Sequence, residues 1–135
     1  MADIVFVGAN LARADAYGLA LSEAGHEVEV FSDPTSARHR LGDKPADLAV
    51  IEVSSADGGP GLLVGQTRAA WPDCRIIALT SLRDADTSNL REMGLWKPDL
   101  SLPESVPPAQ VVRHVAALLA SAGEDPLPGR RLNYA

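Results

Sequence analysis

The chain has 135 residues, of which 46% are hydrophobic and 22% charged, and its formal net charge is −6. This length and composition are typical of one globular domain with a buried core. The acidic balance argues against binding to nucleic acid or to an anionic membrane surface, because both need clustered Lys and Arg. No apolar run approaches the roughly 20 residues of a membrane span, and the N-terminus lacks the basic and apolar regions of a signal peptide. The one cysteine, Cys74, excludes an internal disulfide and fits a reducing, cytoplasmic location, and we expect it to be a buried structural thiol.

Short apolar runs alternate with helical patterns along the chain, which predicts βα units and a parallel sheet. The expected strands cover residues 3–7, 27–31, 48–53, 75–79 and 100–102. The first helix is indicated by helical spacing of Ala12, Ala16, Leu19, Ala20 and Glu23. Gly25 then lies where a C-cap glycine is expected. Three further helices are expected over residues 34–42, 62–71 and 84–93. A loop at 54–61 is expected between the third strand and the helix over 62–71.

The last helix opens at Pro107-Pro108 and is strongly apolar on one face. Beyond Ala122 the chain carries Gly and Pro and then Arg130-Arg131, a composition that predicts a flexible tail. We therefore expect a folded domain over residues 1–122 and a C-terminal tail over residues 123–135.

Three of the expected strands end in residues that would share one crevice, because neighbouring parallel strands deliver their next residues to the same edge of a sheet. The first strand is followed by Gly8-Ala9-Asn10, the third ends near Glu52, and the fourth is followed by Thr80. This set has too little charge to hold a divalent metal tightly, and it contains no activated nucleophile. We expect no metal, no cofactor and no catalytic residue.

The five βα units resemble, in order and length, the receiver domain of bacterial two-component response regulators. The resemblance covers roughly residues 2–120. Its most specific parts are the segment 45–52, similar to the strand that leads to the phospho-acceptor, the segment 76–81, similar to the strand that ends in the switch hydroxyl, and the pair Leu102-Pro103. It implies a flavodoxin-like α/β fold, with a doubly wound five-stranded parallel sheet in the order 2-1-3-4-5 and five helices.

The family's chemistry depends on residues that this sequence replaces. In receiver domains an acid pair binds Mg²⁺, an aspartate accepts the phosphoryl group, and a lysine neutralises it. By the resemblance, the acid pair falls on Gly8-Ala9, with Asn10 next, the acceptor on Glu52, and the lysine on Leu102. Counting back from Gly61 would instead place the acceptor at Val53, but neither alternative supplies an aspartate.

Three further positions follow from the resemblance. Pro103 implies the cis peptide that closes the family's fifth strand. The aromatic switch residue falls on Asp99, and the switch hydroxyl is kept as Thr80. Without metal ligands or the lysine, phosphoryl transfer should be abolished, since it needs a metal and a cation to neutralise charge.

Two readings of Glu52 remain open: a permanent mimic of the phosphorylated state, or an ordinary solvated carboxylate at a strand end. A mimic needs a cationic partner, which Leu102 cannot supply. Thr80 is expected to be a satisfied polar residue that bonds Glu52 or a loop amide. Trp96 could anchor a partner or pack against the neighbouring helix.

We expect a stand-alone, phosphorylation-independent pseudo-receiver that acts as a protein-interaction module in bacterial signal transduction. The partner would be a signalling kinase or regulator, or a second copy, bound through residues 84–121. The alternative is a nucleotide-binding α/β enzyme or subunit. It is disfavoured because, counting from Gly8, Asn10 and Arg13 stand where a dinucleotide fingerprint needs glycines.

Overall fold

The protein was analysed as a computed structural model, which describes residues 2–54 and 59–124. Five parallel strands form one sheet in the order β2-β1-β3-β4-β5. The strands are β1 (Asp3–Val7), β2 (Glu27–Phe31), β3 (Leu48–Val53), β4 (Arg75–Thr80) and β5 (Leu100–Pro103). The helices are α1 (Leu11–Glu23), α2 (Pro34–Asp43), α3 (Gly59–Ala70), α4 (Asp84–Glu92) and α5 (Pro108–Glu124). This confirms the predicted flavodoxin-like architecture and its strand order.

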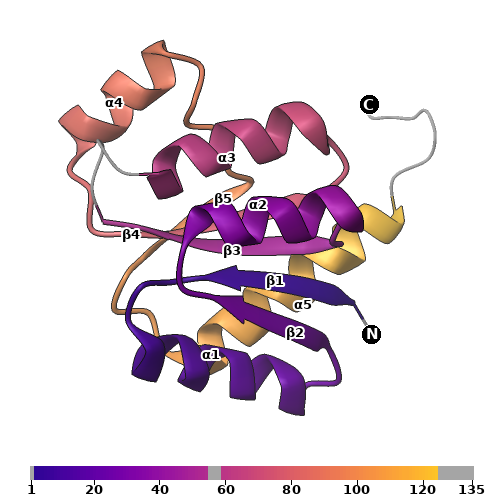
Figure 1. The fold of residues 1–135 in the computed structure, drawn as a ribbon. Coiled ribbons are helices and arrows are strands. Elements are labelled where there is room, and N and C mark those ends of the chain that lie inside the picture. The colour runs from indigo at the N-terminus through magenta and orange to yellow at the C-terminus, as the bar shows by residue number, and fades with distance from the viewer. Residues whose placement is uncertain (1, 55–58, 125–135) are drawn as a thin grey trace.

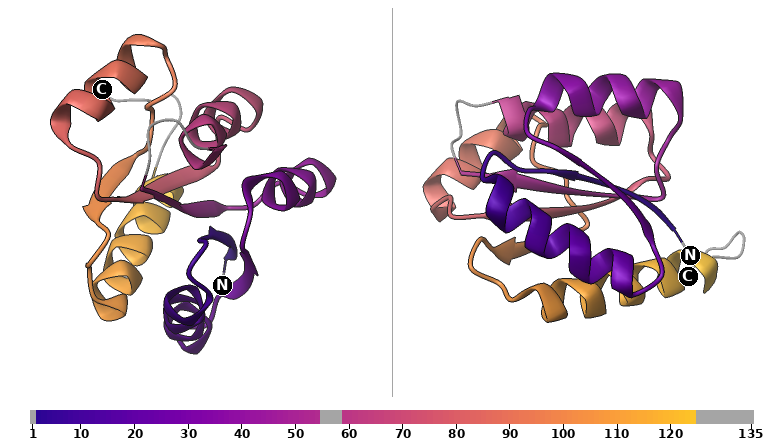
Figure 2. Two further views of the ribbon diagram at one scale, coloured as in Figure 1. Left: turned by 60° about the vertical axis from the view of Figure 1, so that its left-hand side comes forward. Right: turned by 60° about the horizontal axis from the view of Figure 1, so that its bottom comes forward.

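Helices cover both faces of the sheet (Figure 1). Helices α1 and α5 lie on one face, α2 and α3 on the other, and α4 lies beside α3 near the β4 and β5 end (Figure 2). The central strand β3 is therefore buried at every position from Leu48 to Val53, as its continuous apolar sequence predicts. None of the helices in the described ranges is long and apolar enough to cross a membrane.

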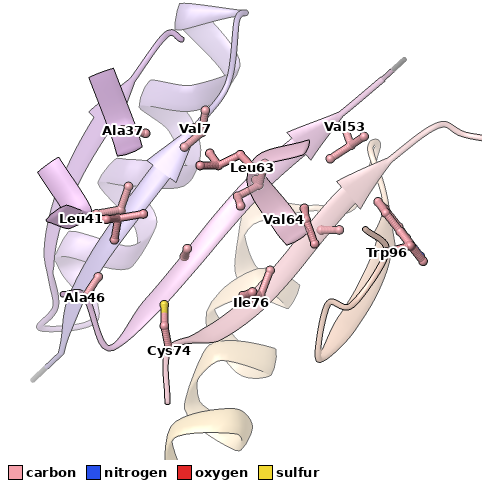
Figure 3. Close-up of a cluster of buried hydrophobic side chains, with 14 of the residues drawn as sticks. Val7, Ala37, Leu41, Ala46, Val53, Leu63, Val64, Cys74, Ile76 and Trp96 are labelled. Atoms are coloured by element: carbon pink, nitrogen blue, oxygen red, sulfur yellow. The ribbon is translucent and has the colours of Figure 1, made fainter. Parts of the chain in front are cut away.

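Each face of the sheet has its own hydrophobic cluster. The cluster under α2 and α3 includes Leu41, Leu63, Val64, Ile76 and Trp96 (Figure 3). Trp96 is buried there, so of its two predicted roles the structure favours packing. Cys74 belongs to the same cluster, and burial raises the pKa of its thiol to about 11, as expected of a structural thiol.

Local capping explains where the helices begin and end. The side chains of Asn10 and Asp33 accept hydrogen bonds from the backbone N–H groups of Arg13 and Ser36, which caps α1 and α2. Gly25, with φ of 98°, closes α1 in the left-handed conformation predicted from the sequence. Helix α3 begins at Gly59, three residues before the predicted start at 62, because Pro60 is tolerated in a first turn.

The buried face of α1 differs from the residues whose spacing predicted the helix. The helix buries Ala14, Tyr17, Gly18 and Leu21, whereas Leu19 is 62% exposed. Tyr17 stacks on Phe6 of β1, with ring centroids 5.5 Å apart, and this aromatic pair selects the buried face. The periodic apolar residues thus predicted the helix correctly without showing which face packs on the sheet.

Two predicted features at the end of the chain differ from the structure or lie outside it. The predicted cis peptide at Pro103 is wrong, because the described residues contain no cis peptide bond. Strand β5 continues through Pro103, which pairs with Thr80, and the next residue, Glu104, donates its N–H to the Thr80 carbonyl. The peptide before Pro103 has the ordinary trans form, which is favoured by about 0.5–1 kcal/mol. Helix α5 reaches Glu124, past the predicted boundary at 122, and the rest of the predicted tail lies outside the described residues.

Candidate functional site

The carboxyl ends of the strands surround a cavity of about 330 Å³. Parallel pairing brings these ends together, since β1 aligns Val7 with Ile51 and β3 aligns Val53 with Thr80. Of the predicted positions, Gly8, Ala9, Asn10 and Glu52 line the cavity. Thr80, Leu102 and Pro103 are not among its described lining residues, which also include Arg13 and Glu104.

Glu52 is the central group of this site, and it is not the solvated carboxylate of one sequence interpretation. It is only 7% exposed, and its Oε2 atom lies 2.8 Å from Arg13 Nε. Alternation along β3 directs Glu52 toward α1 and α5, on the same face as Val50, whereas Val53 is fully buried in the opposite cluster. The acceptor-equivalent position remains a prediction from the resemblance, and of its two alternatives Glu52 is the one that lines the cavity.

Gly8 makes room for this carboxylate. A Cβ atom placed on Gly8 would lie 2.4 Å from Glu52 Oε1 and 3.0 Å from Phe6 Cε1. Real side chains do not approach so closely, so a side chain at this position would force the Glu52 carboxylate or the end of β1 to shift. The small residue at the end of β1 and the buried carboxylate at the end of β3 therefore fit each other sterically.

Arg13 is the functional residue that sequence reasoning missed. It lies in the first turn of α1, where the Asn10 cap holds its backbone N–H at 3.0 Å. Its Nε faces Glu52, and its Nη2 lies 3.3 Å from Oε1 of Glu104, the residue after β5. The sequence does contain a hint of this role. Arg13 stands three residues after Asn10, which follows the first strand and can cap a helix, so Arg13 falls in a first helical turn beside the crevice.

The site is therefore an internal ionic cluster, with one guanidinium between two carboxylates. The sequence argument that no cation is available to Glu52 was wrong, because it considered only the lysine-equivalent position, Leu102. Leu102 is instead half-buried against the cluster under α1 and α5. The cation is supplied instead by Arg13 of helix α1.

These donors do not fit the Mg²⁺ that the fold family implies. Gly8 and Ala9 carry no side-chain oxygen, and the Glu52 carboxylate is paired with Arg13. Within residues 2–54 and 59–124, no group of three or more His, Cys, Asp or Glu side chains is placed to hold a metal ion. A divalent cation entering here would also face the guanidinium, which repels it.

Thr80 and Asp99 hold the backbone at two other places. The Thr80 hydroxyl donates to the Val53 carbonyl at 2.7 Å and accepts from the Leu82 N–H at 2.9 Å. Of the two predicted partners, it uses the loop amide rather than Glu52. Asp99 accepts hydrogen bonds from Arg68 at 2.6 Å and from the Ile76 N–H at 2.7 Å, so it fastens the start of β5 to α3 and β4.

The ionisation of Glu52 should make the free energy of unfolding depend on pH. Burial raises the pKa of Glu52, Arg13 opposes this, and Glu104 adds to it, with a net shift above the ordinary value of 4.5. The folded protein therefore holds a proton at a pH where the unfolded chain has lost it, so stability falls as pH rises through this window.

We expect the free energy of unfolding of the wild type, minus that of Glu52→Gln, to decrease as pH rises from 4.5 through the folded-state pKa of Glu52. Below that window the difference should be constant. Urea denaturation of both proteins over a pH series measures it. A difference that increases with pH would show that ionised Glu52 is favoured by folding.

No family model and no curated protein matches the sequence. Solved structures do match the fold. A response regulator receiver domain protein (CheY-like) from Methanospirillum hungatei is 17% identical, with a TM-score of 0.80 over 90% of this chain and 96% of that one. The signal receiver domain of a modulated diguanylate cyclase from Desulfovibrio desulfuricans is 19% identical, with a TM-score of 0.75 over 91% of this chain and 97% of that one.

The fold is also similar to one part of a longer protein. NtrX from Brucella abortus is 17% identical, with a TM-score of 0.74 over 90% of this chain, and this chain spans 27% of its length. All three likenesses concern the fold at low sequence identity. The chain has the flavodoxin-like fold of response-regulator receiver domains.

Proposed function

We propose that this chain is a phosphorylation-independent receiver-type module that acts in signal transduction by binding a protein partner, and that it is not an enzyme. The observation that carries the proposal is the Glu52–Arg13 pair at the place where a receiver domain accepts phosphate. The carboxylate is buried and its Oε2 lies 2.8 Å from a guanidinium nitrogen. A phosphoryl donor approaching it would have to displace Arg13 and would find no metal ligands at Gly8 and Ala9.

The pair gives new support to a permanent signalling state. A phosphorylated receiver places negative charge against a cation, and here Glu52 and Arg13 supply both charges within the chain. The arrangement needs no phosphoryl group, so we expect the crevice to keep this conformation as long as Glu52 stays ionised and paired with Arg13.

The surface we propose for binding is formed by α4, β5 and α5, residues 84–121. These elements lie along one side of the molecule (Figure 2). Met93, just after α4, is 69% exposed, and α4 itself buries only Leu90. Single exposed apolar side chains are common on protein surfaces, so Met93 serves as the probe of this surface in the test below.

Two experiments test the two parts of the proposal. Incubation with acetyl phosphate and Mg²⁺ should leave the intact mass unchanged, whereas a phosphorylatable receiver treated in parallel gains a phosphoryl group. Proteins retained by the immobilised chain should be lost with Met93→Lys but kept with Leu19→Lys, since both side chains are well exposed and Leu19 lies on α1, outside the proposed surface.

Glu52→Gln should change the affinity for the retained protein by no more than about 1 kcal/mol, as for a substitution outside an interface. If the retained protein is the chain itself, sedimentation should show concentration-dependent association that Met93→Lys removes. A phospho-adduct would refute phosphorylation independence. Equal retention by both lysine variants would refute the surface.

A further inference from the structure

The segment that joins β5 to α5 is held by α1 as well as by its own strand. Its first residue, Glu104, meets Arg13 Nη2 at 3.3 Å, and the carbonyl of Val106 accepts a hydrogen bond from the Tyr17 hydroxyl. Arg13 and Tyr17 lie one turn apart on α1, so a single helix face holds this segment. The segment leads directly into α5, part of the proposed binding surface.

The geometry of Arg13 couples this segment to the crevice. A guanidinium is a rigid planar fork, so the position that brings Nε within 2.8 Å of Glu52 Oε2, as an ion pair without hydrogen-bond alignment, also fixes where Nη2 points. Nη2 in turn meets Glu104 Oε1, while Glu104 Oε2 is buried and has no hydrogen-bond partner among the described residues. The position of the Glu104 carboxylate therefore depends on Arg13, and that of Arg13 depends on Glu52.

The other side of the crevice lacks this dependence. The Thr80 hydroxyl bonds the Val53 carbonyl and the Leu82 N–H, both of which are backbone groups. A change in the charge or position of the Glu52 side chain leaves these bonds in place. Any movement that starts at Glu52 should pass toward Glu104 rather than toward α4.

We propose that Arg13 is a positioning residue that latches the β5–α5 segment to the crevice. While Glu52 is charged and buried, the latch holds residues 104–106 and the first turn of α5. When the Glu52 carboxylate is neutralised or displaced, the segment and the first turn of α5 loosen without movement of the Thr80 side, and the affinity of the binding surface changes only within the limit given above for Glu52→Gln. This inference rests on the proposed function and names how its binding surface would be regulated.

Hydrogen exchange followed by mass spectrometry tests the latch. The informative amides are those of Glu104, Val106 and Gln110, which donate to the carbonyls of Thr80, Pro103 and Pro107. In Glu52→Gln and in Glu104→Gln, we expect exchange of peptides covering residues 104–112 to rise about fivefold. Peptides covering residues 76–84 should change less than about twofold, since their bonds do not involve the ionic cluster.

Arg13→Lys separates the latch from simple charge neutralisation. Lysine keeps the positive charge but has no fork with which to orient both carboxylates. We expect Arg13→Lys to retain most of the wild-type unfolding stability and yet to loosen residues 104–112. Wild-type exchange in Arg13→Lys, or an equal rise in both peptide sets in Glu104→Gln, would overturn the latch.

The result of the hydrogen-exchange experiment is independent of the result of the phosphorylation experiment. A phospho-adduct with acetyl phosphate would refute the proposed function while leaving the exchange pattern unchanged. Unchanged exchange in all variants, together with an unchanged mass, would refute the latch and leave the phosphorylation-independent module standing.

Discussion

Replacing Arg13 with alanine should lower the free energy of unfolding by about 3 kcal/mol at neutral pH, because it leaves the Glu52 carboxylate buried without its counter-ion. Glu52 is 7% exposed and the Arg13 side chain 37%, so water that enters the place of the guanidinium restores only a part of the lost interaction. Urea denaturation followed by circular dichroism gives the difference. This is the largest effect we expect from any single substitution in the site.

Two controls accompany this measurement. Arg38→Ala removes an exposed arginine of α2 and should change stability by less than about 0.5 kcal/mol. Glu52→Gln combined with Arg13→Ala should recover most of the loss, since no buried charge then remains unpaired. If the double variant were as unstable as Arg13→Ala, the loss would come from the packing of the arginine side chain and not from its charge.

Replacing Gly8 with alanine should destabilise the protein by about 2 kcal/mol, as for an added methyl group in a packed site. The new Cβ would lie 2.4 Å from Glu52 Oε1, so the carboxylate must leave its place beside Arg13 or the end of β1 must shift. Thermal and urea denaturation measure the loss.

The matched substitution is Gly42→Ala. Gly42 lies in α2 with no atom within 4 Å of the added Cβ, so alanine there should be neutral or stabilise the helix by about 0.5–1 kcal/mol. In a Glu52→Ala background, Gly8→Ala should cost much less, because the colliding oxygen is gone. An equal cost in both backgrounds would mean that Phe6, rather than Glu52, opposes the new methyl group.

Much of the fold could be predicted from the sequence because its signals are local. The alternation of β-branched runs with helical spacing placed all five strands and their helices, and the requirement for right-handed crossovers then limited the strand order. Turn residues such as Gly25 act through their own backbone conformation, so the end of α1 could also be predicted from the sequence. The prediction at Pro103 had no such local signal. The cis peptide was inferred from resemblance alone, and the described residues contain no cis peptide bond.

The sequence by itself determined which chemical groups reach the crevice: Gly8, Ala9, Asn10 and Glu52, with no aspartate at any of the three strand ends. Only the tertiary structure decided that Glu52 is buried and that Arg13, 39 positions earlier in the chain, is its cation. An ion pair between a helix and a non-adjacent strand depends on how α1 is rotated against the sheet. The packing of Tyr17 on Phe6 sets that rotation, and no local pattern records it.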